Sequence, residues 1–357
     1  MSLLWRDTVA MPDAIERTLV ARDGVDAVVA ELRDARTRRI VASGNGAAWY
    51  VSHALWLASL EGVPPTAPLI SLPAGALAGG RFRWRAGDVL LAVSTSGELR
   101  DLIDVVDVQA GTDGPDRTAL ITATPNSSLA RRATAVATTR LADPAAFTHS
   151  QAYVSNVALG LLILAETTAD RGLARLVRRT PAAAAEAVQA VEAWSVEADP
   201  SNSGSRPDVP RSVTVFGSGP AWAAALEAAL LLREVGRLAA EGTETREAAT
   251  SSMFGLGPAD LVVSLPIAGD RWLDEAERTC AGTGARVVRI PGSGRADARL
   301  APILAFPGSV HLSIRFAELQ GLDPDAPETA TAYYATARRV APGPGASGAE
   351  GDAARSG

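Results

Sequence analysis

Ser94, Thr95, Ser96 and Gly97 stand directly between an apolar run and a helix-like segment, residues 99–108. Short hydroxyl side chains donate hydrogen bonds, N–H groups at a helix N-terminus favour anions, and a glycine lets the backbone turn closely around a ligand. This combination predicts a phosphate-binding loop that needs no lysine. The alternative is an ordinary helix whose first turn is capped by a serine or a threonine.

The other reactive residues do not indicate metal-dependent chemistry. The three histidines, His53, His149 and His311, and the single cysteine, Cys280, are scattered along the chain without the spacing that holds a metal ion. One cysteine also cannot form an intramolecular disulfide. We therefore expect neither a metal nor a cofactor.

The composition excludes several classes of partner. Of the 357 residues, 47% are hydrophobic, all 34 basic residues are arginine, and the formal net charge is −6. A nucleic-acid-binding protein usually carries a basic face, and the sequence has no such cluster. The longest apolar run, residues 157–165, is about half of the ~20 residues that a membrane-spanning helix needs, and the amino terminus lacks a signal-peptide pattern. We expect a cytoplasmic protein that binds neither nucleic acid nor membrane.

The hydroxyl loop belongs to an alternation of strands and helices. Residues 39–46 predict a strand that ends in a glycine-rich turn at Gly44-Asn45-Gly46, and a helix follows at residues 47–61. Further strands are expected at residues 69–72, 88–93, 118–122 and 134–139. Helices are expected as an introductory pair within residues 1–34, then at 127–132, 148–167 and 181–197. Such an alternation is typical of a three-layer α/β fold with a parallel sheet, in which ligands bind beyond the carboxyl ends of the strands.

A second glycine turn indicates an internal repeat of about 170 residues. Gly217-Ser218-Gly219 again follows a strand, at residues 212–217, and precedes a long helix predicted over residues 221–240. The remaining elements are expected as strands at 261–266, 286–290 and 303–306 and a helix at 272–281. The domain organisation predicted from this pattern is introductory helices 1–34, a first domain 35–198, a loop 199–208, a second domain 210–340 and a disordered tail 341–357.

These motifs together resemble those of a tandem sugar isomerase (SIS) domain protein, such as the isomerase half of glucosamine-6-phosphate synthase and related phosphosugar isomerases and deaminases. The resemblance covers nearly the whole chain. Besides the two glycine turns and the loop of residues 94–98, it rests on Met11-Pro12, on residues 126–130 and on residues 322–327. It implies two three-layer α/β/α SIS domains with parallel sheets of flavodoxin-like topology.

The resemblance also implies a ligand and the residues that bind it. A sugar phosphate or amino-sugar phosphate would be bound by Ser94, Thr95, Ser96 and Gly97, together with Gly46 and Ala47 of the first turn. Three positions depart from the family pattern. Leu99, Ala47 and Ala48 stand where the family commonly has hydroxyl side chains.

The catalytic positions implied by the resemblance are only partly kept. Glu234 stands at the position of the carboxylate that moves a proton between sugar carbons, and Glu227 lies seven residues earlier, close to the same helix face. Glu247 is kept as a second candidate acid, but Thr250 stands where the family has a histidine and Ala332 where it has a lysine. Without the resemblance, Glu234 would be interpreted as a surface residue paired with Arg233 or Arg237.

Two functions remain open on the sequence. One is an enzyme that isomerises an aldose or ketose phosphate, or deaminates or deglycates an amino-sugar phosphate, with Glu234, Glu247 and His149 as catalytic candidates; His149 begins a helix that lines the sugar site in the family. The other is a non-catalytic phosphosugar-binding or regulatory protein. In either case we expect a homodimer, because tandem proteins of this type usually complete each site with a neighbouring chain.

Overall fold

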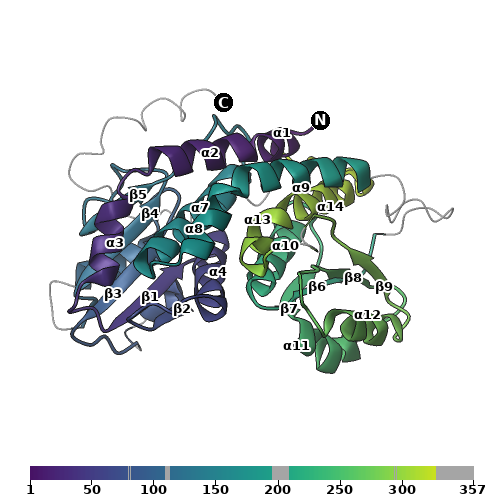
Figure 1. Cartoon of the computed structure of the whole chain (residues 1–357). Helices are drawn as coiled ribbons and strands as arrows, with labels where there is room; N and C mark the ends of the chain where they lie inside the picture. Colours follow the sequence, from purple (N-terminus) through teal and green to yellow (C-terminus); the bar gives the residue numbers. More distant parts are fainter. Residues whose placement is uncertain are drawn as a thin grey trace.

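The chain folds around two parallel β-sheets with helices on both faces, which confirms the α/β fold class (Figure 1). The computed structural model describes residues 1–78, 80, 82–108, 113–194, 209–292, 294 and 296–326. The predicted loop 199–208 and tail 341–357 lie outside the described residues, and so does Ala332.

The first sheet has five strands in the order β2-β1-β3-β4-β5, which is the flavodoxin-like order. Its strands are β1 (Arg39–Gly44), β2 (Leu69–Pro73), β3 (Asp88–Val93), β4 (Arg117–Thr122) and β5 (Ala135–Thr138). Neighbouring residues of β3 alternate between two cores: Leu91 packs into one and Leu90 into the other. Burial on both faces is what the uninterrupted apolar run of β3 predicts.

The second sheet repeats the central part of this order with four strands, β7-β6-β8-β9. They are β6 (Val213–Gly217), β7 (Ala240–Glu244), β8 (Leu261–Ser264) and β9 (Arg286–Arg289). In both sheets the strand before the glycine turn lies between the next two strands of the chain, so each turn lies at the carboxyl end of a central strand.

The helices of the first half are α1 (Leu3–Val9), α2 (Met11–Ala21), α3 (Val25–Arg33), α4 (Ala47–Glu61), α5 (Ala74–Ala78), α6 (Arg100–Asp107), α7 (Ser150–Thr167), α8 (Arg171–Arg178) and α9 (Thr180–Trp194). The helices of the second half are α10 (Pro220–Glu234), α11 (Thr245–Thr250), α12 (Leu273–Ala281), α13 (Ala301–Leu304) and α14 (Phe306–Leu319), with 3-10 turns η3 (Ser252–Gly255) and η4 (Ala298–Leu300).

Three introductory helices replace the predicted pair. Pro12 lies in the first turn of α2 and has no N–H to continue α1, so the chain breaks at Ala10. Another break follows α2, where Arg22 and Gly24 both adopt positive φ. The helix expected at residues 127–132 is instead a series of turns.

The second half corrects two further predictions. The helix expected over residues 221–240 ends at Glu234, because Arg237 turns the chain with φ +53°, and Ala240, the last residue of that stretch, begins β7. The strand expected at residues 303–306 is helical, since these residues belong to α13 and α14. His311 therefore lies within a helix rather than after a strand.

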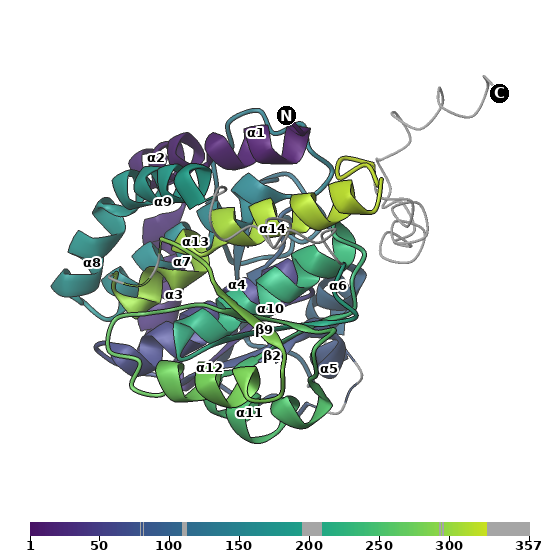
Figure 2. The ribbon, with the colours of Figure 1, turned by 90° about the vertical axis from the view of Figure 1, so that its right-hand side faces the viewer.

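Helices α4 and α10 pack against each other between the two sheets (Figure 1). Helix α7 packs on α4 from the first half, and α14 packs on α10 from the second. Figure 2 shows α14 between α1 and α10. Residues Ala298–Leu319 have the length and hydropathy of a membrane span, but 89% of that window is buried inside the protein, as is typical of a core helix.

Candidate functional site

The hydroxyl loop follows β3 and is held in place by the chain that follows β4. The Ser94 N–H donates to the Ile121 carbonyl at 3.0 Å. The Thr95 carbonyl accepts hydrogen bonds from the hydroxyls of Thr122 and Thr124, at 3.1 and 3.2 Å. The backbone of the loop is therefore fixed by its neighbours and does not depend on a ligand for its shape.

Gly97 is required at its position by both its backbone and its surroundings. Its φ is +64°, and a Cβ added there would lie 1.9 Å from the hydroxyl oxygen of Ser127. The Gly97 carbonyl in turn accepts a hydrogen bond from the Leu129 N–H at 3.0 Å. The sequence prediction that this glycine allows a close turn has a direct structural cause.

The three loop hydroxyls share one property that suits them to an anion. Each hydroxyl oxygen accepts a hydrogen bond from the protein: Ser94 from the Gly97 N–H at 3.1 Å, Ser96 from the Glu98 N–H at 3.3 Å, and Thr95 from the Asn156 amide at 3.3 Å. A hydroxyl that already accepts still has its own proton to donate. Three potential donors thus lie on three consecutive residues.

Helix α6 begins at Arg100, directly after this loop, with Leu99 at its N-cap position. The Leu99 side chain makes no capping hydrogen bond, so the first-turn N–H groups keep the partial positive charge of a helix N-terminus. The first glycine turn is tied to the same helix, because the Asn45 amide donates to the Asp101 carboxylate at 2.7 Å. The loop and the turn therefore form one edge of the first sheet.

The two glycine turns have almost the same backbone geometry. Gly46 has φ 53° and ψ −131°, and Gly219 has φ 53° and ψ −134°. Each begins a helix of 15 residues, and each helix ends at a glutamate, Glu61 in α4 and Glu234 in α10. A Cβ at position 219 would lie 2.3 Å from the carboxylate of Glu61. The end of α4 thus reaches the beginning of α10.

The end of α10, which carries Glu234, lies in turn near the first glycine turn. A Cβ added at Gly46 would have Leu230 of α10 as its nearest contact, at 3.7 Å, and Glu234 is one helical turn beyond Leu230 on the same face. Burial among neighbouring atoms raises the pKa of the Glu234 carboxyl, which the Arg233 guanidinium partly opposes. By solvent accessibility, however, Glu234 is an exposed residue.

Tyr50 of α4 is 8% exposed. The charges of Arg233, Glu227 and Glu234 of α10 all act on its phenol. Burial raises the pKa of Tyr50, and Arg233 opposes the shift. The sequence analysis missed this tyrosine, although its place one turn after Gly46 was a usable signal.

Glu227 is the most deeply buried carboxyl of this region. Its exposed fraction is 4%, and its Oε2 atom has no hydrogen-bond partner. Burial raises the pKa of Glu227 well above its ordinary value, and the Glu234 charge adds to the shift. The hydroxyl of Tyr153 on α7, on which the Glu227 charge acts, is also buried without a hydrogen-bond partner. Since Asn156 of the same helix contacts Thr95, α7 connects the hydroxyl loop to the carboxyls of α10.

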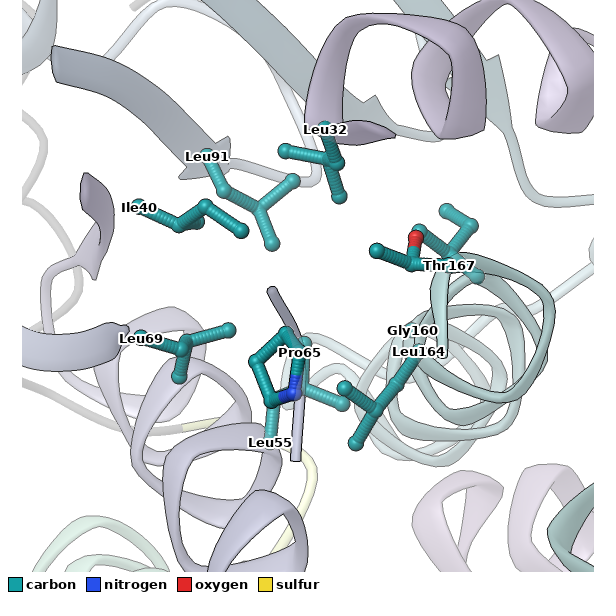
Figure 3. Close-up of a pocket in the computed structure, with 10 residues that line it drawn as sticks. Leu32, Ile40, Leu55, Pro65, Leu69, Leu91, Gly160, Leu164 and Thr167 are labelled. Carbon is teal, nitrogen blue, oxygen red and sulfur yellow. The ribbon is translucent and has the colours of Figure 1, made fainter. Parts of the chain in front are cut away.

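A cavity of about 10 Å³ in the first half is not a sugar site (Figure 3). Leu32, Ile40, Leu91 and other aliphatic side chains line it between the sheet and α7. Such a volume is near the minimum that one water molecule needs, and a water would also need several polar partners. We interpret it as a packing gap.

Residues 31–165 match the family model for the SIS domain. This segment contains the first sheet, the glycine turn, the hydroxyl loop and most of α7. This segment is similar to an SIS domain, and we refer to it by that name. The family model matches this one segment, so the second SIS domain that the sequence predicted is not confirmed. A comparison of the sequence with curated proteins finds no match.

Three solved structures place the SIS domain and the second half together in one known fold. The C-terminal domain of glucosamine-fructose-6-phosphate aminotransferase from Francisella tularensis aligns with a TM-score of 0.74, 16% identity, and coverage of 91% of this chain and 98% of that one. Tagatose-6-phosphate ketose/aldose isomerase from Escherichia coli aligns with a TM-score of 0.70 and 15% identity, and the alignment covers 91% of this chain and 94% of that one. Glucosamine-6-phosphate deaminase from Thermotoga maritima aligns with a TM-score of 0.66 and 15% identity, and the alignment covers 86% of this chain and 98% of that one. At such identities the likeness shows the fold.

The structure places the remaining predicted site residues on α7 and α11. His149 is exposed at the N-cap of α7, the helix of the SIS domain that carries Asn156. Glu247 is exposed on α11, which packs on α12, β6 and β7 of the second half. Thr250 donates its hydroxyl to the Arg246 carbonyl at 2.7 Å. Catalytic roles for His149 and Glu247 stay predictions.

His53 is a buried packing residue of α4. It lies between Trp49, Trp56 and Trp222, with ring centroids at 5.7, 5.1 and 4.6 Å. Neither ring nitrogen has a hydrogen-bond partner, and burial lowers the pKa of His53 to about 4. Among the described residues, no group of three histidine, cysteine or acidic side chains could hold a metal ion.

Proposed function

We propose that the protein binds a sugar phosphate at the Ser94–Gly97 loop and isomerises it, or deaminates or deglycates the corresponding amino-sugar phosphate, through an enediol or enamine. The SIS domain supports this ligand class, as does the structural likeness to proteins named as an isomerase, a deaminase and an aminotransferase of such sugars. One observation supports the proposal: three hydroxyls lie at the same edge of the first sheet as the glycine turn. A Cβ at Gly46 of that turn would lie 3.7 Å from Leu230 of α10, which is one helical turn before Glu234.

In this proposal the loop and Glu234 have separate tasks. The hydroxyls and the N-terminus of α6 bind the phosphate, which holds the sugar in a fixed register. Glu234 removes the proton from carbon 2 of the open chain and returns it to carbon 1. A carboxyl with a raised pKa suits this role, because a general base works best when its pKa approaches the working pH.

A non-catalytic phosphosugar-binding protein is the second candidate. Two observations favour it. Thr250 stands where the family has a histidine, and its hydroxyl donates a hydrogen bond to a backbone carbonyl. Ala47 and Ala48 also offer no hydroxyl at the first glycine turn. These differences remove catalytic and sugar-contacting groups and leave the phosphate loop intact. The alternative therefore predicts binding without turnover.

Two measurements separate these functions. Binding of a panel of hexose 6-phosphates is measured by calorimetry, and exchange of the carbon-2 hydrogen in deuterated water is followed by NMR. The enzyme proposal expects both, whereas binding without exchange would leave only the regulatory function. Absence of binding to the whole panel would reject both candidates.

The matched variants test where the phosphate binds. Ser96→Ala should weaken binding about tenfold, because a hydrogen bond to an anion contributes somewhat more than ~1 kcal/mol. Ser218→Ala is the control, because Ser218 lies in the second glycine turn and its hydroxyl donates a hydrogen bond to Asp270 Oδ2 at 2.8 Å. Equal affinity of the Ser96 variant and the wild type would show that the ligand binds elsewhere.

We further propose that this enzyme is a cytoplasmic homodimer and that the second half is a diverged SIS domain. The shared central strand order and the matching angles at Gly46 and Gly219 support the second part of this proposal. Light scattering of the full chain tests the dimer, and a monomeric mass at working concentration would contradict it.

A further inference from the structure

We propose that Asn156 of α7 is a positioning residue of the phosphate site, which orients the Thr95 hydroxyl so that its proton is directed to the bound phosphate. The inference rests on the proposed binding of a sugar phosphate at the Ser94–Gly97 loop, and it applies to the enzyme and to the regulatory candidate alike. Because Asn156 is 1% exposed, it acts on the ligand through Thr95 and not by touching it.

The Asn156 side chain reaches the loop from the interior of the protein. Every residue of α7 except Glu166 is buried, and the Asn156 amide donates a hydrogen bond to Thr95 Oγ1 at 3.3 Å. Thr95 itself is partly exposed. The bond therefore extends from the core to a residue of the hydroxyl loop that a ligand can contact.

The backbone of Thr95 is fixed without Asn156. The Thr95 carbonyl accepts hydrogen bonds from the Ala123 N–H at 3.1 Å and from the hydroxyls of Thr122 and Thr124 at 3.1 and 3.2 Å. These bonds hold the main chain but do not determine how the Thr95 hydroxyl rotates about its C–O bond. The bond from Asn156 is what determines that rotation.

The direction of this bond determines what the Thr95 hydroxyl can do. A hydroxyl has one proton to donate and two lone pairs that accept. With the Asn156 N–H at one lone pair, the Thr95 proton points away from Asn156, and it is donated to no acceptor in the described part of the chain. A phosphate oxygen is an acceptor of the required kind, and a donor that is already oriented loses less conformational freedom on binding.

The cost of burying the amide argues against a purely structural role for Asn156. Its Oδ1 atom is buried and has no hydrogen-bond partner among the described residues. Burying an unpartnered carbonyl oxygen costs at least as much free energy as one neutral hydrogen bond contributes. Leucine has the same branching and the same number of heavy atoms as asparagine. At this position it should therefore leave the fold no less stable than the wild type.

The test is a double-mutant cycle in the full chain, with calorimetry of the hexose 6-phosphate that the wild type binds most tightly in the panel. Thr95→Val should weaken binding about tenfold, because it removes a hydrogen bond to an anion. Asn156→Leu should weaken it about fivefold, as expected for residues coupled through one hydrogen bond, and should not lower the unfolding temperature. Asn156→Ala, which also lacks the donor, replaces the leucine variant if that variant does not fold.

The two backgrounds show whether Asn156 acts through Thr95. In Thr95→Val, the further change Asn156→Leu should alter the dissociation constant by less than about twofold, because the hydroxyl that Asn156 orients is absent. Ser96→Ala is the matched control, since the Ser96 hydroxyl accepts its hydrogen bond from the Glu98 N–H and not from Asn156. In that background Asn156→Leu should keep its effect of about fivefold.

The possible results separate this inference from the proposed function. If both Asn156 variants bind as the wild type does, or if Thr95→Val leaves binding unchanged, the positioning role is overturned and the phosphate site at the loop stands. It is also overturned if the effect of Asn156→Leu persists in Thr95→Val together with a lower unfolding temperature, which is what a structural residue would give. A wild type that binds no member of the panel would overturn the proposed function, and this inference with it.

Discussion

The β1–α4 and β6–α10 units have the same strand–turn–helix geometry and yet present different groups at their turns. The loop beside Gly46 carries three hydroxyls, whereas the loop beside Gly219, residues 265–270, is largely apolar and ends at Asp270. The second turn also has the carboxylate of Glu61 against it. A helix N-terminus favours a negative charge, and in the second half the chain's own carboxylate takes that place.

This difference shows that the anion site is determined by the loops around a turn and not by the turn itself. Both turns offer a glycine with positive φ and a helix N-terminus. Only the first is adjoined by donors with protons to give, while an incoming phosphate at the second would meet Glu61 and Asp270. We therefore expect one sugar phosphate per chain, bound in the first half.

The largest expected effect comes from the two helix-terminal glutamates. Glu234→Gln should lower the rate of carbon-2 exchange by about 10²- to 10⁴-fold, because the general base is lost. Glu61→Gln, at the equivalent end of α4, should leave the rate within about threefold. Exchange measured by NMR on both variants distinguishes them, and equal losses would mean that the two ends of the helix pair are not functionally different.

The glycines of the two loops should differ next. Gly97→Ala combines a left-handed backbone with a Cβ 1.9 Å from Ser127 Oγ, and should lower the free energy of unfolding by roughly 4 kcal/mol. Gly269→Ala has φ +80° but no atom within 4 Å of the new Cβ, so about 1 kcal/mol is expected. Urea unfolding measures both. A Gly97 variant as stable as the Gly269 variant would contradict the close contact at the hydroxyl loop.

The smallest effect concerns acid stability, where α4 has His53 and α10 has Leu226 at the equivalent position. Because the folded pKa of His53, about 4, is below its unfolded value of 6.5, the unfolded chain binds the proton first and stability is lost as the pH falls from about 6.5 to 4. His53→Leu should remove about 3 kcal/mol of that loss. Denaturant unfolding at several pH values checks this, and a His53→Leu variant that keeps the wild-type loss of stability below pH 6.5 would contradict it.

Local sequence signals were sufficient for the first half of the fold. Helix α4 has the predicted bounds, because Gly46 and Gly62 delimit its apolar residues. Local sequence signals were insufficient in the second half, where tertiary contacts determine the bounds and type of some elements. The prediction extended the helix after Gly219 past Gly236, although α10 ends at Glu234, two residues before that glycine. The segment Ile303–Phe306 is short, apolar and bounded by prolines, which is the pattern of a strand, but it spans the end of α13 and the start of α14.

The candidate site divides in the same way. Ser94, Thr95, Ser96 and Gly97 are neighbours in sequence, so their residue types alone predicted a loop with donors. The group around Tyr50, Arg233 and Glu227 joins helices from opposite halves of the chain. No spacing rule connects residues so far apart, and their proximity depends on how α4 and α10 pack.

The reciprocal approach of α4 and α10 has a consequence for dissecting the protein. Each helix belongs to one sheet, but its C-terminal part lies near the glycine turn of the other half, through Glu61 of α4 and Leu230 of α10. A fragment that ends after α9 would therefore retain the phosphate loop and lose both α10 glutamates. Such a fragment could at most be a ligand trap. Restoring turnover would require the complementary piece in trans, which makes a split version of the chain a sensor of whether its two pieces meet.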